Sequence, residues 1–317
     1  MVDFVIGNDK FGESLANFLK CDYRKFEEGF YPDSEYCPFV DAGYEELEGK
    51  EVVLAPRAGV YLKSENLALT IQNFQRIANA LSDEKIFNVK SVDFVFPYFW
   101  FARQDHNPRY DQDEKVKKRD EGKDIGFKYI TRSFKGLGVR KILSVNPHFH
   151  RSPGSFMVDD MEIISISGMP ALARYLKTQP YYNPNTLVIG PDLNANVLSE
   201  ELAKELGLKS TNLSKERIDS SKVFFGGLYD VKGSDVIISD DIISTGNTIA
   251  QGIKVLENAK NVVVASVHPV LTPSGEKILN ELQSSGKVKD VVASDTLPSK
   301  FSKTSVVSEV AACLSNS

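Results

Sequence analysis

The sequence Val-Ile-Ile-Ser-Asp-Asp-Ile-Ile-Ser-Thr-Gly-Asn-Thr-Ile-Ala-Gln-Gly occupies residues 236 to 252. It begins with a continuous apolar run, which is typical of a buried parallel strand. Two carboxylates, a small hydroxyl-rich loop and the start of a helix follow this run. Because ligands of open α/β sheets bind beyond the carboxyl ends of such strands, this segment predicts an α/β protein with a ligand site at one edge of its sheet.

The residue types in this segment fit a sugar phosphate. Asp240 and Asp241 are adjacent carboxylates that can bind vicinal hydroxyls of a ribose. The loop that follows offers hydroxyls and backbone N–H groups at the head of a helix, whose dipole favours an anion. Its residues are Ser244, Thr245, Gly246, Asn247 and Thr248. An ordinary acidic turn with a helix N-cap would use similar residues, but the whole combination in one frame favours a sugar-phosphate site.

Short apolar runs alternate with helical patterns along nearly all of the 317 residues. The expected strands are 3–6, 51–55, 91–96, 141–145, 162–166, 186–189, 235–239, 261–267 and 289–293. The clearest expected helices are 66–81, 196–206, 248–258 and 275–284. This alternation predicts mostly parallel sheets with helices on both faces, and the number of strands predicts two consecutive domains.

The domain boundary is expected in the Pro- and His-rich stretch near residues 146 to 160. We therefore predict an N-terminal domain over residues 1–148 and a C-terminal domain over residues 149–317 that carries the sugar-phosphate site. For the C-terminal helix, the sequence leaves open whether it packs back on the first domain.

Composition narrows the possible functions. Hydrophobic residues make up 42% and charged residues 26%, as in a soluble globular protein. The net charge of −5 gives no basic footprint for nucleic acid, and no apolar run has the length of a membrane helix. The three cysteines form no Cys-x-x-Cys pair and the N-terminus is unlike a signal peptide, so a cytoplasmic protein is expected.

Several further motifs follow predicted strands. Arg103, Gln104 and Asp105 come after an aromatic run, residues 98–101, which on its own indicates a buried cluster. An Arg suits a phosphate and an amide suits a purine edge. His148 lies beyond the strand ending at residue 145, and a contact with Mg²⁺-bound phosphate fits it better than a tight transition-metal site.

The remaining candidates have a structural and a functional interpretation. Asp192 follows the strand ending at residue 189 and is either a helix cap or a second carboxylate at the ligand edge. Lys215 and Arg217 lie in a polar stretch that is either a surface loop or a loop closing over a phosphate. Residues 31–35, Tyr-Pro-Asp-Ser-Glu, by themselves indicate a turn.

Taken together, these motifs resemble the ribose-phosphate pyrophosphokinase family, the synthetases of phosphoribosyl pyrophosphate, and the archaeal type in particular. The likeness extends over nearly the whole chain. Its strongest elements are residues 240–248, the Ala-Arg-Gln-Asp at 102–105 and the Gly-Pro-Asp at 190–192, supported by residues 215–219 and 295–302. The resemblance implies two phosphoribosyltransferase-like domains and transfer of the β,γ-diphosphate of Mg-ATP to the 1-hydroxyl of ribose 5-phosphate, which yields phosphoribosyl pyrophosphate and AMP.

The resemblance also implies roles by position. Asp240 and Asp241 would hold the ribose hydroxyls and residues 244–248 the 5-phosphate, while Lys215 and Arg217 would stabilise the transferring group. Asp192 would belong to the loop that receives the diphosphate and its metal, and His148 would contact the ATP phosphates or their Mg²⁺. The residues implied for ATP binding are Arg103, Gln104, Asp105 and, reaching the adenine of a neighbouring subunit, Tyr31, Asp33 and Glu35. A homodimer or a larger homo-oligomer would follow.

Some positions depart from the family pattern. Asn194 and Ala195 stand where the family has two glycines, Asn146 replaces an Asp, and Asn247 replaces a Gly. Three of these changes, at 194, 195 and 247, fall where the acceptor would lie, which keeps open a diphosphokinase acting on another acceptor such as ADP-ribose. A non-catalytic regulatory paralogue is a third reading, although Lys215 and Arg217 are both present. A nucleobase phosphoribosyltransferase would leave the first 145 residues unexplained.

Overall fold

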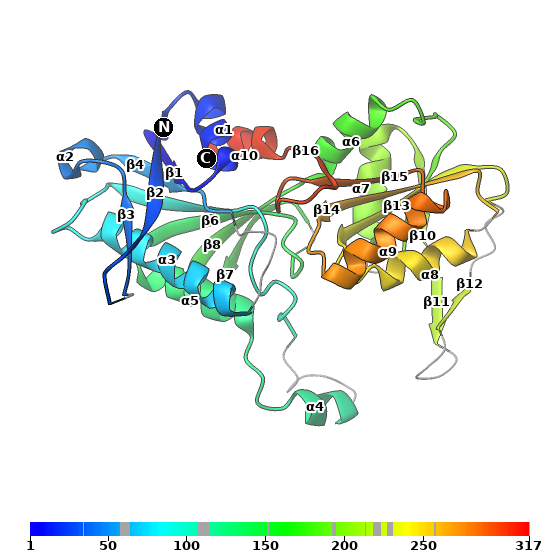
Figure 1. Cartoon of the computed structure of the whole chain (residues 1–317), viewed down its shortest axis with the longest axis horizontal. Coiled ribbons are helices and arrows are strands. Elements are labelled where there is room, and N and C mark those ends of the chain that lie inside the picture. The colour runs from blue at the N-terminus through cyan, green and yellow to red at the C-terminus, as the bar shows by residue number, and fades with distance from the viewer. Residues whose placement is uncertain are drawn as a thin grey trace. The chain divides into compact units, whose positions relative to one another are not determined.

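A computed structural model describes residues 1–33, 35–57, 64–106, 114–150, 152–191, 195–212, 214–217, 223–226, 231–256 and 258–316. The chain forms two compact units. The first comprises Met1–Ile166 together with Val307–Ser317, and the second comprises Ser167–Val306. Each unit contains a sheet with helices around it (Figure 1).

The first unit contains an eight-stranded sheet in the order β3-β2-β1-β4-β5-β6-β8-β7. Its strands are β1 (Phe4–Gly7), β2 (Asp22–Phe30), β3 (Tyr36–Val40), β4 (Glu51–Leu54), β5 (Ser91–Phe96), β6 (Val139–Val145), β7 (Gly154–Val158) and β8 (Met161–Ile166). Six strands are parallel, and only the edge strands β3 and β7 pair antiparallel. Its helices are α1 (Lys10–Leu19), α2 (Tyr44–Leu47), α3 (Ser64–Ser82), α4 (Glu114–Asp120), α5 (Gly126–Gly136) and α10 (Val307–Ser315).

An aromatic core fills the space between this sheet and the helices α3 and α5. Phe94 of β5 is fully buried, with its ring centroid 4.4 Å from that of Phe134 and 6.4 Å from that of Phe74. Trp100 stacks on Phe74 at 5.4 Å. The helices α1 and α10 pack together on the opposite face of the sheet (Figure 1).

The second unit contains a six-stranded sheet in the order β10-β9-β13-β14-β15-β16, in which every pair is parallel. Its strands are β9 (Leu187–Gly190), β10 (Lys209–Asn212), β13 (Asp235–Ile242), β14 (Asn261–His268), β15 (Asp290–Ser294) and β16 (Ser302–Thr304). A separate antiparallel ribbon is formed by β11 (Ser214–Arg217) and β12 (Val223–Gly226). The helices are α6 (Met169–Lys177), α7 (Asn196–Leu206), α8 (Asn247–Val255) and α9 (Pro273–Ser284).

Alternate residues of the central strands pack on opposite helix layers in this unit. Val236 and Ile238 of β13 join one buried cluster with Ile253 of α8 and Leu279 of α9. Because side chains alternate along a strand, the residues between them face α6 and α7. A sheet covered on both faces in this way is the α/β architecture expected from the sequence, and the predicted fold class is confirmed.

The boundary between the units differs from the sequence expectation. It lies after Ile166 rather than after residue 148. The physical reason is pairing: β8 lies parallel to β6, and β7 folds back on β8, so residues 154–166 complete the sheet of the first unit. The C-terminal helix α10 also belongs to the first unit. No helix in the described ranges has both the length and the apolar character needed to cross a membrane.

We predict that Phe94→Ala destabilises the first unit by about 3–5 kcal/mol, because it removes a buried ring and leaves a cavity. The chain has a single Trp, Trp100, so its fluorescence during urea unfolding reports on this unit. The control is Phe18→Ala on α1, where the side chain is 61% exposed and the change should stay within about 0.5 kcal/mol. Equal stabilities for the two variants would contradict the aromatic core.

Candidate functional site

The carboxyl end of β13 carries the two predicted carboxylates. Asp240 is half-buried and Asp241 is 7% exposed. The Asp241 N–H donates to Oδ1 of Asp240 at 2.9 Å, and the Ile242 N–H donates to Oδ1 of Asp241 at 2.8 Å. Each carboxylate is therefore oriented by the backbone amide of the next residue.

The predicted phosphate loop follows at once. Gly246 is the N-cap of α8 and has a φ of 74°. Glycine adopts this left-handed conformation with less steric strain than any other residue. Its cap makes no side-chain hydrogen bond to the first turn of the helix. The Asn247 N–H, the first of α8, donates to the Thr245 hydroxyl at 3.5 Å. Helix N-termini leave such N–H groups without intrahelical partners, and this is the feature that the sequence prediction of a phosphate site relies on.

Asn247 is the first residue of α8 and does not have a positive φ. The replacement of the family's Gly at this position therefore needs no left-handed backbone. Thr245 and Asn247 are exposed, while Ser244 and Thr248 are half-buried. The predicted residues from 240 to 248 are thus brought together at one edge of the sheet.

The start of α9 packs against the loop at Ser244. The Ser244 carbonyl accepts hydrogen bonds from the Thr272 N–H at 3.2 Å and the Thr272 hydroxyl at 3.4 Å. A β-carbon at Gly275 would collide with the same carbonyl oxygen. The loop therefore packs directly on Gly275, where there is no room for a side chain.

The loop after β9 is only partly described. Asp192 and Asn194 lie outside the described residues. Ala195 has a φ of −81° and is buried, so its β-carbon fits where the family has a glycine. Gly190, at the end of β9, has Ser199 Oγ 2.8 Å from the position of a β-carbon, which explains the glycine there.

Lys215 and Arg217 lie on β11, with Lys215 opposite Phe225 and Arg217 opposite Val223 of β12. The sequence left open a surface loop or a loop closing over a phosphate. The backbone instead forms part of an antiparallel ribbon.

In the first unit, two of the predicted groups follow neighbouring parallel strands. Arg103, Gln104 and Asp105 are exposed after β5, and His148 is half-buried after β6. Tyr98, Phe99 and Trp100 are buried, as the aromatic run predicted.

The segment after β6 is held by packing. His150 stacks on Phe156 at 3.7 Å and Phe149 stacks on Phe127 at 4.2 Å, so aromatic packing holds both rings. Asn146 has a φ of 37°, a left-handed conformation that Asn tolerates better than most residues. His148, like His150, is half-buried.

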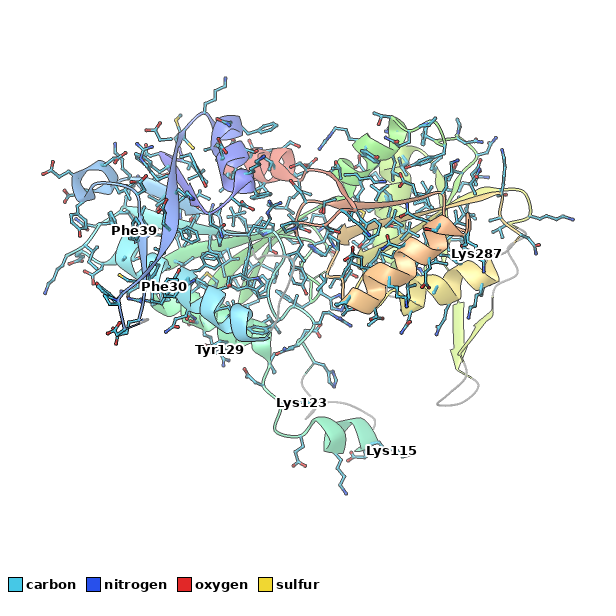
Figure 2. The ribbon with its side chains drawn as sticks, viewed as in Figure 1. Phe30, Phe39, Lys115, Lys123, Tyr129 and Lys287 are labelled. Carbon is cyan, nitrogen blue, oxygen red and sulfur yellow. The ribbon has the colours of Figure 1, made fainter. Side chains whose placement is uncertain are left out.

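The third predicted group lies at the tip of the β2–β3 hairpin rather than at a sheet edge. The Tyr31 N–H donates to the Glu35 carbonyl at 2.8 Å, and the Glu35 N–H donates to Oδ1 of Asp33 at 3.0 Å. The hairpin also exposes the rings of Phe30 and Phe39 (Figure 2).

A side-chain hydrogen bond with Cys37 is the main cause that raises the pKa of Tyr31.

Sequence reasoning missed a row of buried polar side chains beside the carboxylates. Ser266, His268, Ser294 and Thr296 are each at most 1% exposed. The signal available in the sequence was the polar pair Ser266 and His268 at the end of the otherwise apolar run 261–267. Its meaning depends on the neighbouring strand, which a single strand pattern does not identify.

Comparison with known proteins places these observations in a family. A family model described as a phosphoribosyl transferase domain matches residues 158–295. The chain is 27% identical over 310 residues to the ribose-phosphate pyrophosphokinase of Methanopyrus kandleri, covering 97% of this chain and 96% of that protein. It is 31% identical over 228 residues to ribose-phosphate pyrophosphokinase 1 of Archaeoglobus fulgidus, covering 71% of this chain and 72% of that one.

The chain belongs to the ribose-phosphate pyrophosphokinase family. A crystal structure of phosphoribosylpyrophosphate synthetase from Mycobacterium smegmatis shares its fold, with a TM-score of 0.76 at 21% identity over 100% of both chains. The ribose-phosphate pyrophosphokinase resemblance predicted from the sequence, including its archaeal type, is confirmed.

We predict that Gly275→Ala lowers the free energy of unfolding by about 1–3 kcal/mol, because the new methyl group must displace the Ser244 carbonyl. Urea unfolding followed by circular dichroism measures the change. Gly136→Ala, at an open position where a β-carbon meets no atom within 4 Å, is the matched control and should be neutral or slightly stabilising. A Gly275 variant as stable as the control would mean that the loop does not rest on α9.

Proposed function

We propose that this protein is a ribose-phosphate pyrophosphokinase that transfers the β,γ-diphosphate of Mg-ATP to the 1-hydroxyl of ribose 5-phosphate. The observation that carries the proposal is the pair of oriented carboxylates, Asp240 and Asp241, a few residues before helix α8, whose N-cap is Gly246. Family membership supports the same reaction.

The second unit would bind the acceptor. Carboxylate oxygens accept hydrogen bonds from hydroxyls and are strong acceptors when ionised, so Asp240 and Asp241 suit the 2- and 3-hydroxyls of ribose. The 5-phosphate would accept hydrogen bonds from the first N–H groups of α8 and from the Thr245 and Thr248 hydroxyls. Ribose 5-phosphate would then be fixed at both ends, with its 1-hydroxyl directed to the donor.

The chemical step needs position and charge neutralisation more than a poised base. The oxygen of the 1-hydroxyl bonds to the β-phosphorus of ATP, the bond from the β-phosphorus to the α,β-bridging oxygen breaks, and AMP leaves with that oxygen. The hydroxyl proton is released. Lys215 and Arg217 would stabilise the charge on the transferring group, and Asp192 would belong to the loop that receives the diphosphate.

Mg²⁺ would arrive with ATP. It prefers oxygen ligands, keeps several waters and is usually held through one or two carboxylates plus substrate phosphates. Within the described ranges no cluster of three or more His, Cys, Asp or Glu forms a preassembled cage. The Asp192 carboxylate would provide an oxygen ligand, and the half-buried His148 imidazole suits a contact with a metal-bound phosphate.

The first unit would bind the nucleotide. Arg103 suits the ATP phosphates, and Gln104 and Asp105 would lie beside the nucleotide. In the reading we adopt, Tyr31, Asp33 and Glu35 reach the adenine of a neighbouring subunit, so the active unit is a homodimer or a larger homo-oligomer.

The three cysteines are free thiols, which accords with the cytoplasmic location that we propose.

The ordinary backbone at two departures from the family supports ribose 5-phosphate as the acceptor. Ala195 has a negative φ and Asn247 continues into α8. Neither residue requires a remodelled loop that would fit a different acceptor.

The decisive experiment is ³¹P NMR of the purified protein with Mg-ATP and ribose 5-phosphate, then with ADP-ribose. We expect AMP and a new anomeric diphosphate from ribose 5-phosphate. Turnover with ADP-ribose alone would move the function to that acceptor. If neither acceptor gives a product although ATP still binds, a regulatory paralogue would be the remaining interpretation.

Replacing both carboxylates, as Asp240→Asn with Asp241→Asn, should raise the KM for ribose 5-phosphate about 10- to 100-fold, because charged hydrogen bonds to the sugar are lost. The KM for ATP should change little. Steady-state kinetics with each substrate varied in turn gives both values, and an equal rise in both would contradict the acceptor role.

Lys215→Ala and Arg217→Ala should each lower kcat about 10²- to 10³-fold and leave ATP affinity nearly unchanged, as expected for groups that act in the transition state. Lys287→Ala, at an exposed position of the second unit (Figure 2), is the charge-matched control and should keep full activity. An unchanged kcat in both β11 variants would remove this assignment.

A further inference from the structure

A buried imidazole beside the ribose-binding carboxylates has no part in the reaction proposed above. His268 ends β14 and is 1% exposed, and its backbone is paired with Ile242 of β13. A buried polar ring needs a hydrogen-bond partner, and the partner determines which ring nitrogen carries the proton.

The ring is anchored to the turn that follows β15. Nδ1 of His268 lies 2.9 Å from Oγ1 of Thr296, and that hydroxyl lies 3.0 Å from the carbonyl oxygen of Val267. The Val267 carbonyl also accepts from the Ser294 hydroxyl at 2.6 Å, and its two lone pairs have room for both hydroxyl hydrogens. With the Thr296 hydrogen on this carbonyl, the Thr296 oxygen accepts from the ring, and a neutral imidazole carries its proton on Nδ1.

The backbone of the same residue holds the acceptor site. The His268 carbonyl accepts from the Ile243 N–H at 3.0 Å and from the Val270 N–H at 3.0 Å. The Ser266 hydroxyl donates to the Asp241 carbonyl at 3.1 Å. The end of β14 is therefore bonded to β13 on both sides of Ile242, between the carboxylates and the phosphate loop.

We propose that His268 is a positioning residue for the ribose 5-phosphate site, acting through the Ile243 backbone rather than by contact with substrate. The hydrogen bond to Thr296 fixes the His268 ring, and the ring fixes the end of β14. The His268 carbonyl then sets where the chain leaves β13 for the loop at 244–248. This inference rests on the proposed function for the identity of the ligand.

The test is a set of matched variants assayed with each substrate varied in turn. His268→Leu and Thr296→Val keep the volume and remove one side of the hydrogen bond, while His268→Asn and Thr296→Ser keep a donor or a hydroxyl. We expect the first two to raise the KM for ribose 5-phosphate about tenfold, the value of one buried hydrogen bond. The KM for ATP and kcat should stay within about twofold, and the conservative variants should remain near wild type.

A double-mutant cycle separates positioning from general damage. His268→Leu combined with Thr296→Val should weaken ribose 5-phosphate no more than either change alone, because both remove the same hydrogen bond. Additive losses, or equal rises in the KM for both substrates, would overturn the proposal. Urea unfolding of each variant checks that the fold is retained.

Two measurements do not depend on turnover. Proton–nitrogen NMR of the imidazole should show the proton on Nδ1, and the Ile243 amide should exchange its hydrogen faster in Thr296→Val than in Thr296→Ser. A proton on Nε2, or equal exchange rates, would overturn the inference even in an active enzyme. Conversely, wild-type protein that makes no product while both results hold would refute the proposed reaction and keep the structural role of His268.

Discussion

Two backbone hydrogen bonds at the end of β13 orient the candidate carboxylates of the second unit. Polar groups next to an apolar core lose hydration, and hydrogen bonds within the protein offset this loss. The N–H groups of Asp241 and Ile242 donate to Asp240 and Asp241 in this way. The strand can therefore be part of the buried core and still present carboxylate oxygens at its end.

The surrounding elements are arranged around that constraint. The strand on one side, β14, bonds to the exit of β13 through the His268 carbonyl, and α9 supports the loop through Thr272 and Gly275. These contacts come from segments 25 to 31 residues further along the chain. The loop itself is short and has a left-handed glycine, so its position depends on this outside support.

The parts of the fold that the sequence predicted well are the buried parallel strands. The strands β5 and β13–β15 begin within a residue of their expected positions, because a strand buried on both faces needs an unbroken apolar run. The hairpin β2–β3 was missed, since Asp22–Phe30 is rich in charge and is stabilised by pairing rather than burial. The strand β7, Gly154–Val158, was also missed, because it is mostly exposed and is held by pairing with β8. This pairing explains why the first unit extends to Ile166 rather than ending at residue 148.

The site shows a similar division. Residues from Asp240 to Thr248 could be predicted because strand, carboxylates and helix start are consecutive in the chain. His268 and Thr296 could not, since they are 28 residues apart and meet only because β14 and β15 are neighbours. Residues whose role depends on strand order need the structure, whereas a motif contained in one loop does not.

The discontinuous composition of the first unit has a consequence for synthesis on the ribosome. Its last helix, α10, is made after every element of the second unit and packs against α1, which is made near the beginning. The second unit thus has all of its strands and helices before the first unit does, the reverse of the usual N-terminal-first order for domains. Until translation reaches residue 315, the nascent chain has all the strands of the first sheet but lacks the helix α10 that packs with α1 on one of its faces.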